Sequence, residues 1–260
     1  TLALITQATL KLTPLAEAKR TLRATYADIH AAATAVAAIM AQPVTPCSLE
    51  FMDGPAIDMV RDFSDLGLPE GTGALLMIEV DGPAHCIGEA AQAVAAAAEV
   101  PGLQDLHTAA REEEVAALWR TRKALSPALR HVAPKKINED VVVPVSRMGA
   151  FIDGLERLSR ETGIRIVNFG HAGNGNIHVN LLVDPDDPDE MARAAGCLDA
   201  VFSLVIELEG TLSGEHGVGL EKRDFVHREI EPATLRLMRA IKRQFDPRDI
   251  LNPGKSLPPV

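Results

Sequence analysis

Residues 166–183 read IVNFGHAGNGNIHVNLLV, in which two apolar runs flank a stretch of glycine, asparagine and histidine. The apolar runs predict two strands, and Asn174-Gly175 is a strong two-residue hairpin signal, so we expect an antiparallel hairpin with its tip there. In that register His171 lies directly opposite His178, with their Cβ atoms roughly 4.5–5.5 Å apart. Asn180, two residues further on, points to the same face.

Two imidazoles placed in this way can bind one metal ion, at roughly 2.0–2.1 Å from each nitrogen. The stretch SGEHGVG (213–219) adds Glu215 and His216 between glycines. Two histidines and a glutamate suit Zn²⁺, Mn²⁺, Co²⁺ or Fe²⁺. We expect the adjacent side chains of Glu215 and His216 to point apart, so that one binds metal and the other faces a substrate as a base. The alternative is a polar hairpin with exposed histidines and a glycine-rich turn with incidental charge.

The rest of the chain alternates between strand and helix patterns. Further strands are expected over 3–12, 47–53, 73–82 and 139–144, and helices over 14–40, 83–100, 108–125, 145–163, 190–209 and 232–244. We expect Pro127 to end or kink the third of these helices. Arg122 and Ser126 lie four residues apart on one helix face, where a guanidinium and a hydroxyl can hold a carboxylate. A surface arginine and a serine before a proline are the alternative.

Composition excludes several classes of protein. The net charge of −10 argues against nucleic-acid binding, which selects basic surfaces. Three scattered cysteines argue against a disulfide framework or a cysteine-based zinc site, and favour the reducing cytoplasm. No apolar run reaches membrane-spanning length. GHAGNG and GEHGVG have glycines in the order G-x-x-G-x-G, so they do not predict a nicotinamide or ATP site.

Several motifs together resemble the C-terminal half of the FAD-linked oxidases, in the vanillyl-alcohol oxidase superfamily. They are LEFMD (49–53), LWRTRKAL (118–125), NEDVVVP (138–144), GHAGNGNIHVN (170–180), SGEHGVGLEKRDF (213–225) and FDPRDILNPGK (245–255). The resemblance spans essentially all 260 residues. It implies an α+β fold with a largely antiparallel sheet flanked by helices, the FAD-binding domain being absent from this chain. Residues 1–13 would be the exit strand from that domain, 14–190 the substrate (cap) domain, and 191–260 a C-terminal helical segment returning to the FAD domain.

The resemblance also implies roles for individual residues. His171, His178 and Glu215 match the family's divalent metal ligands, and His216 matches its catalytic base. The other matches are Arg122, Ser126 and Asn180, which would contact substrate, and Asn252, which would approach the flavin. Asn138 stands where some members have a lysine that meets the substrate, which leaves that contact open.

The function implied is the substrate-binding and catalytic half of a FAD-dependent D-2-hydroxyacid dehydrogenase, a group that includes D-lactate and D-2-hydroxyglutarate dehydrogenases and the glycolate oxidase FAD subunit. The partners would be a small 2-hydroxy acid and an electron acceptor, such as a quinone or an electron-transfer protein; a homodimer is left open. We expect a cytoplasmic protein, with peripheral membrane attachment through its acceptor also open. The fragment alone should be inactive. A non-catalytic metal-binding subunit and a metal-dependent hydrolase are the alternatives.

Overall fold

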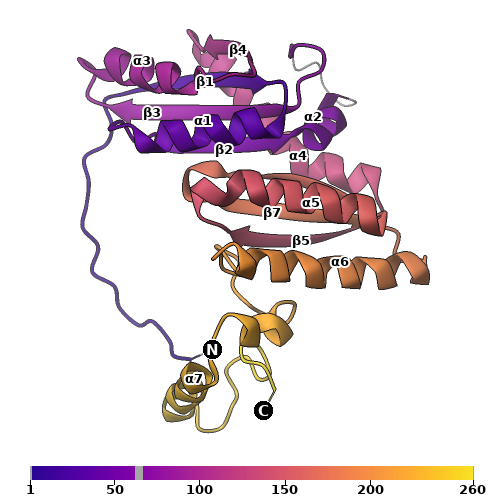
Figure 1. The fold of residues 1–260 in the computed structure, drawn as a ribbon. Coiled ribbons are helices and arrows are strands. Elements are labelled where there is room, and N and C mark those ends of the chain that lie inside the picture. Colours follow the sequence, from indigo (N-terminus) through magenta and orange to yellow (C-terminus); the bar gives the residue numbers. More distant parts are fainter. Residues whose placement is uncertain (1, 62–66, 260) are drawn as a thin grey trace.

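The computed structural model describes residues 2–61 and 67–259 and has a mixed α+β fold (Figure 1). One antiparallel sheet has the strand order β4-β1-β3-β2-β6-β7-β5, so the expected fold class is confirmed. The strands are β1 (Ala18–Tyr26), β2 (Ser48–Asp53), β3 (Ala74–Gly82), β4 (Leu103–Thr108), β5 (Lys135–Val142), β6 (Arg165–His171) and β7 (Asn176–Val183). The helices are α1 (Ile29–Ala41), α2 (Gly54–Arg61), α3 (Ile87–Ala98), α4 (Glu112–Val132), α5 (Met148–Thr162), α6 (Pro188–Glu207) and α7 (Pro232–Phe245).

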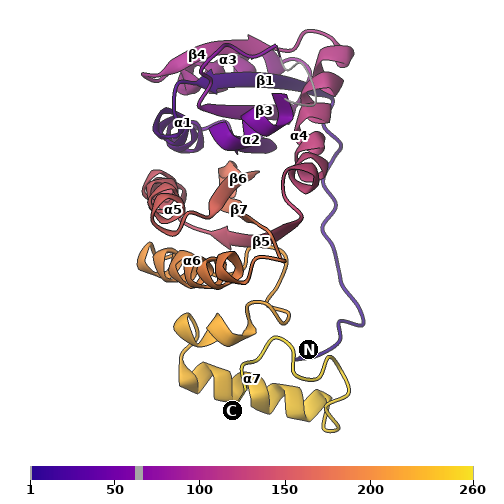
Figure 2. The same cartoon turned by 90° about the vertical axis from the view of Figure 1, so that its right-hand side faces the viewer.

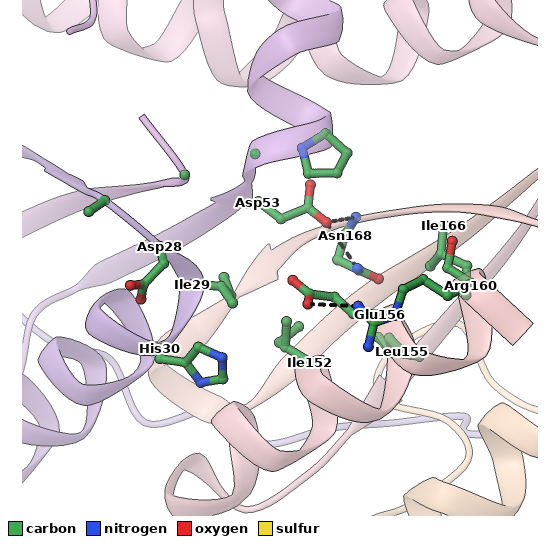
Figure 3. Close-up of a pocket in the computed structure, with 15 residues that line it drawn as sticks. Asp28, Ile29, His30, Asp53, Ile152, Leu155, Glu156, Arg160, Ile166 and Asn168 are labelled. Atoms are coloured by element: carbon green, nitrogen blue, oxygen red, sulfur yellow. Dashed lines mark hydrogen bonds and ion pairs between the residues drawn. The ribbon is translucent and has the colours of Figure 1, made fainter. Parts of the chain in front are cut away.

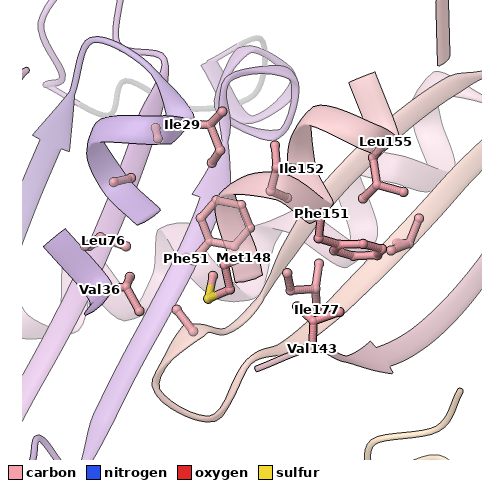
Figure 4. Close-up of a cluster of buried hydrophobic side chains, with 14 of the residues drawn as sticks. Ile29, Val36, Phe51, Leu76, Val143, Met148, Phe151, Ile152, Leu155 and Ile177 are labelled. Carbon is pink, nitrogen blue, oxygen red and sulfur yellow. The ribbon is translucent and has the colours of Figure 1, made fainter. Parts of the chain in front are cut away.

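Helices cover both faces of the sheet, and the alternation of side chains along each strand decides which face each residue supplies. Phe51 of β2 belongs to the larger core, where side chains of α1 and α5 lie around it (Figure 4). Side chains of α3 and α6 complete this core. The next residue, Met52, belongs to a second buried cluster that contains Ile57 of α2 and Leu125 of α4. Each large apolar side chain buried in this way stabilises the fold by roughly 1.5–3 kcal/mol. Residues of β2 with even numbers therefore face α4.

The hairpin of β6 and β7 forms, but the predicted register was wrong by two residues. His171 pairs with Asn176, and Phe169 pairs with His178. The turn is longer than two residues because a 3₁₀ turn, Ala172–Asn174, precedes Gly175. Gly175 has a φ of 73°, and a Cβ atom there would lie 1.9 Å from the carbonyl oxygen of Val143. A shift of two preserves the side-chain alternation, so the two histidines still share a face, as diagonal neighbours.

The N-terminal expectations differ most from the structure. The helix expected over 14–40 begins only at Ile29, after Asp28 caps it by accepting a hydrogen bond from the Ala31 amide. Residues 18–26 instead form β1, whose inward side chains pack in the core. The strand expected over 3–12 is absent, because nothing in the described chain offers that segment a partner strand.

Other element predictions hold in outline. The strands over 47–53, 73–82 and 139–144 appear as β2, β3 and β5, and Gly163, at a φ of 69°, ends α5 as predicted. Pro127 does not end its helix, contrary to one of the two expectations for it, because α4 continues to Val132. Buried Leu125 and Leu129 stabilise α4 on either side of the proline.

The C-terminal segment extends beyond the β5 edge of the sheet, with η3 (Arg223–Arg228) and α7 lying apart from the strands in both views (Figures 1 and 2). Leu237, Ile241 and Phe245 are spaced four residues apart on α7, and all three are exposed. Within residues 2–61 and 67–259, none of the helices combines the length and apolar character that crossing a bilayer requires.

Candidate functional site

Three side chains from distant parts of the sequence converge on the sheet face that α4 covers. Nε2 of His171, at the end of β6, lies 3.7 Å from Oε1 of Glu215, and Nε2 of His178, in β7, lies 3.5 Å from the same oxygen. One potential ligand atom from each residue lies within 4.8 Å of the other two. Ligands at 2.0–2.2 Å from one zinc-sized ion are roughly 3–3.5 Å from each other. The donor types suit a divalent metal ion, and the two separations from Glu215, 3.5 and 3.7 Å, lie close to this range.

The two histidines have different electrostatic environments. His178 is buried, and burial together with the neighbouring His171 lowers its pKa to about 4, so it is neutral at neutral pH. Neutral imidazole is the form that binds metals. His171 lies with Nδ1 2.6 Å from Oε1 of Glu50, and this hydrogen bond raises the pKa of His171. When Nδ1 is the donor, Nε2 keeps its lone pair and faces Glu215.

A buried ion pair anchors the loop that carries Glu215. Asp140 of β5 is fully buried and accepts hydrogen bonds from the backbone amides of Glu215 and His216. Lys222, which is only 3% exposed, donates to the carboxylate and, over 2.7 Å, to the carbonyl oxygen of the same aspartate. Burial opposes ionisation, but these donors outweigh it and lower the pKa of Asp140 to about 2. Sequence reasoning missed both residues. Asp140 stands at the start of the apolar run DVVVP, and a charged residue in that place could have indicated a buried, paired carboxylate.

His216 lies beside the ligand cluster rather than away from it. Its Nδ1 atom is 3.5 Å from Oδ1 of Asp140, its Nε2 atom is 3.8 Å from Oε1 of Glu215, and its ring stacks on His178 with centroids 5.4 Å apart. The expectation that Glu215 and His216 point apart was wrong. That expectation assumed an extended loop, whereas the loop curls so that both backbone amides bind the same Asp140 oxygen.

Arg122 of α4 reaches the same cluster. Its Nε atom donates to Oε2 of Glu50 over 2.9 Å, and its guanidinium carbon lies 4.8 Å above the ring of Phe169. Among the described residues, no protein partner is recorded for the two terminal nitrogens of Arg122, so its bidentate edge is available to a ligand. Sequence reasoning singled out Arg122 but missed Glu50 and Phe169.

The remaining predicted residues lie in varied surroundings. The side chain of Ser126 lies outside the described part of the structure. Asn180 faces the same side as His178, as predicted, but is fully buried, and its amide nitrogen donates to the carbonyl oxygens of Val167 and His178. Asn138 pairs with Asn180 across β5 and β7. Neither Asn138 Oδ1 nor Asn180 Oδ1 has a hydrogen-bond partner within the described residues. Asn252 lies in a turn after α7, exposed and with a φ of 51°.

Two cavities flank this region of the sheet. One, of about 340 Å³, opens beside Glu50 and His171 and is also lined by Cys47 and Gly173. The other, of about 460 Å³, lies on the opposite face between α1 and α5 (Figure 3). At its floor Asp53 accepts hydrogen bonds from the backbone and side-chain amides of Asn168, and burial raises the pKa of Asp53 to about 7.

Comparison with known proteins identifies relatives over the whole chain. It is 38% identical to the glycolate oxidase subunit GlcD of Bacillus subtilis, over 98% of this chain and 54% of that protein. It is 29% identical to a probable mitochondrial D-lactate dehydrogenase of Danio rerio, over 99% of this chain and 52% of that protein. The chain thus spans about half the length of these curated relatives.

A solved structure and a family model extend the comparison. The fold resembles p-cresol methylhydroxylase in a structure with substrate bound, with a TM-score of 0.72 at 16% identity, over 94% of this chain and 54% of that one. The model for FAD linked oxidases, C-terminal domain, matches residues 15–256. The chain therefore belongs to the family of the FAD linked oxidases, C-terminal domain.

Proposed function

We propose that this chain is the substrate-binding and catalytic half of a FAD-dependent D-2-hydroxyacid dehydrogenase. One observation carries the proposal: a set of metal-type ligands, His171, His178 and Glu215, lies beside a candidate base, His216, and an arginine with an open bidentate edge, Arg122. A 2-hydroxy acid needs these three functions, because its hydroxyl must lose a proton while its carboxylate is held. The names of the relatives, which include glycolate oxidase and D-lactate dehydrogenase, support the same substrate class.

Each residue has a defined task in this proposal. Arg122 pairs through its terminal nitrogens with the substrate carboxylate, as arginine does in bidentate recognition. His216 accepts the hydroxyl proton at Nε2, while Asp140 near its Nδ1 stabilises the resulting imidazolium. His171, His178 and Glu215 would hold the divalent ion, chosen from Zn²⁺, Mn²⁺, Co²⁺ and Fe²⁺. When bound, the ion would supply a Lewis acid for the substrate hydroxyl, and FAD would supply the hydride acceptor.

The rest of the enzyme lies outside this chain in the proposal. FAD would be held mainly by a separate domain, with residues 1–13 leading out of it, 14–190 forming the substrate domain and 191–260 returning to it. The exposed apolar side chains Leu237, Ile241 and Phe245 on α7 support such a contact, and Asn252 would approach the flavin. A quinone or an electron-transfer protein would reoxidise the flavin, in the cytoplasm or at the membrane surface.

Turnover of the full-length protein tests the proposal. We expect flavin-loaded protein to reduce an artificial dye with at least one of D-lactate, D-2-hydroxyglutarate, glycolate and D-malate, and to prefer D over L enantiomers. His216→Asn should lower kcat by about 10²–10⁴-fold while the flavin stays bound. No dye reduction with any of these acids, or ester hydrolysis without dye reduction, would contradict the proposal and favour a metal-dependent hydrolase.

A further inference from the structure

We infer that Glu50 is a positioning residue that holds the metal ligand His171 and the carboxylate-binding Arg122 in one fixed geometry. The inference rests on the proposed function and adds to it a residue to which the preceding mechanism gives no task. Glu50 lies in β2, directly opposite His171 in the antiparallel pairing of β2 with β6. It is only 7% exposed, so its contacts are shielded from solvent.

The two carboxylate oxygens of Glu50 are divided between the two partners. Oε1 lies 2.6 Å from Nδ1 of His171, and Oε2 accepts from Nε of Arg122 over 2.9 Å. Burial alone would raise the pKa of Glu50, but the bonds from His171 and Arg122 outweigh it and lower that pKa. One ionised side chain therefore sets the distance and orientation between the two groups.

Both contacts leave the functional atoms of the partners facing the site. On His171, a hydrogen bond at Nδ1 selects the tautomer whose Nε2 lone pair faces Glu215, which is the arrangement expected of a carboxylate behind a metal-bound histidine. On Arg122, a single side-on bond at Nε leaves the terminal nitrogens for a ligand, and stacking on Phe169 fixes the plane of the guanidinium.

A purely electrostatic role and a positioning role of Glu50 predict opposite changes in KM for Glu50→Gln. The formal charges of Glu50, Glu215 and Arg122 sum to −1 (two carboxylates and one guanidinium), and a divalent ion changes the sum to +1. Glu50→Gln removes one negative charge, so electrostatics alone would tighten the binding of an anionic substrate and lower KM. If Glu50 acts by positioning, the same variant weakens substrate binding and raises KM.

Glu79 provides a matched control on the same sheet face. It too is buried, in β3, it accepts a hydrogen bond from α4 through Nε1 of Trp119 over 3.4 Å, and bonds from Lys19 and Thr21 help to lower its pKa. No contact of Glu79 with His171 or Arg122 is recorded in the described chain. Glu79→Gln therefore reproduces the structural cost of losing a buried carboxylate without disturbing the site.

The experiment compares Glu50→Gln and Glu79→Gln in the full-length flavoprotein. Metal affinity is measured by competition with a chromogenic chelator for Zn²⁺ and for Mn²⁺, which needs no turnover. KM and kcat are then measured at saturating metal. For Glu50→Gln we expect about 10–100-fold weaker metal binding, the range for a lost outer partner of a metal-binding histidine, and a higher KM. For Glu79→Gln we expect wild-type metal affinity and KM, whatever its melting temperature.

The outcomes separate this inference from the proposed function. Unchanged metal affinity in Glu50→Gln, a lowered KM, or an equal effect of Glu79→Gln overturns the positioning role while leaving the proposed function in place. Wild-type protein that binds neither metal nor a 2-hydroxy acid overturns both. If Glu50→Gln does not fold, Glu50→Asp serves instead: it keeps the charge but is one methylene too short to reach both partners, so the same loss of metal affinity is expected.

Discussion

Replacing Lys222 by methionine should destabilise the fold strongly, although the residue lies far along the chain from the sheet it contacts. Its ammonium donates to the carboxylate and the carbonyl of Asp140 and lies 3.5 Å from Glu139. Both acidic residues are almost completely buried, with Asp140 at 0% and Glu139 at 3% exposure. Removing one partner of a buried ion pair costs about 3–5 kcal/mol, because the remaining charge stays desolvated.

Urea denaturation measures this loss as a lower midpoint at an unchanged slope. Arg157→Met is the control, because Arg157 and Glu161 form an exposed pair at 4.0 Å whose loss should cost less than about 1 kcal/mol. The pKa of Asp140 is lowered to about 2 from an ordinary 3.8, so its contribution is present above pH 3.8 and is lost as the pH falls towards 2. The difference between wild type and Lys222→Met should therefore shrink in acid. A loss no larger than that of Arg157→Met would refute the reasoning.

Three further predictions follow from the site and its supports. Glu215→Gln should lose metal affinity and regain part of its activity with excess metal, whereas His216→Asn should keep its metal and lose about 10²–10⁴-fold in kcat. Metal affinity is measured by chelator competition and kcat by steady-state kinetics. The opposite pattern would show that the two roles are exchanged. The pKa of Asp53 is raised to about 7, so the folded protein binds this proton more tightly than the unfolded chain does. The stability of wild type relative to Asp53→Asn should therefore fall as the pH rises from about 4 to 7. A difference in urea midpoint that does not depend on pH would contradict this. Gly175→Ala should cost at least ~1 kcal/mol for its left-handed backbone, before the contact with Val143 is counted, and an unchanged urea midpoint would be inconsistent with that turn.

The sequence predicted the convergence of the histidines but not the manner in which they meet. Asn-Gly suggested a two-residue turn, whereas the chain uses Gly175 after a 3₁₀ turn so that it can approach Val143 closely. The error moved the pairing by two residues, an even number, so the face assignment of His171 and His178 survived. Side-chain periodicity is a local property, whereas turn length depends on a neighbouring segment that the local pattern does not contain.

The residues that sequence reasoning missed act through partners that are distant in sequence. Glu50 reaches Arg122 and His171, which are 72 and 121 positions away, and Asp140 holds amides about 75 positions away. A lone acidic residue in an apolar strand shows that a partner must exist, because a buried charge is costly. It does not show which partner, so the ligands could be predicted from motifs while their supports could not.

The pairing of β2 with β6 has a further consequence for the motions of the protein. It contains three register pairs, Glu50 with His171, Phe51 with Gly170 and Met52 with Phe169, whereas β1 and β3 share nine. This short junction joins strands β4, β1, β3 and β2 to strands β6, β7 and β5, and Glu50 and His171 form the pair at one end of it. We expect local opening of this short pairing to be seen as amide hydrogen exchange at Phe51 and Gly170. A ligand bound at once to His171 and Arg122 would bridge the junction, so slower exchange at these amides would report occupancy without any catalytic turnover.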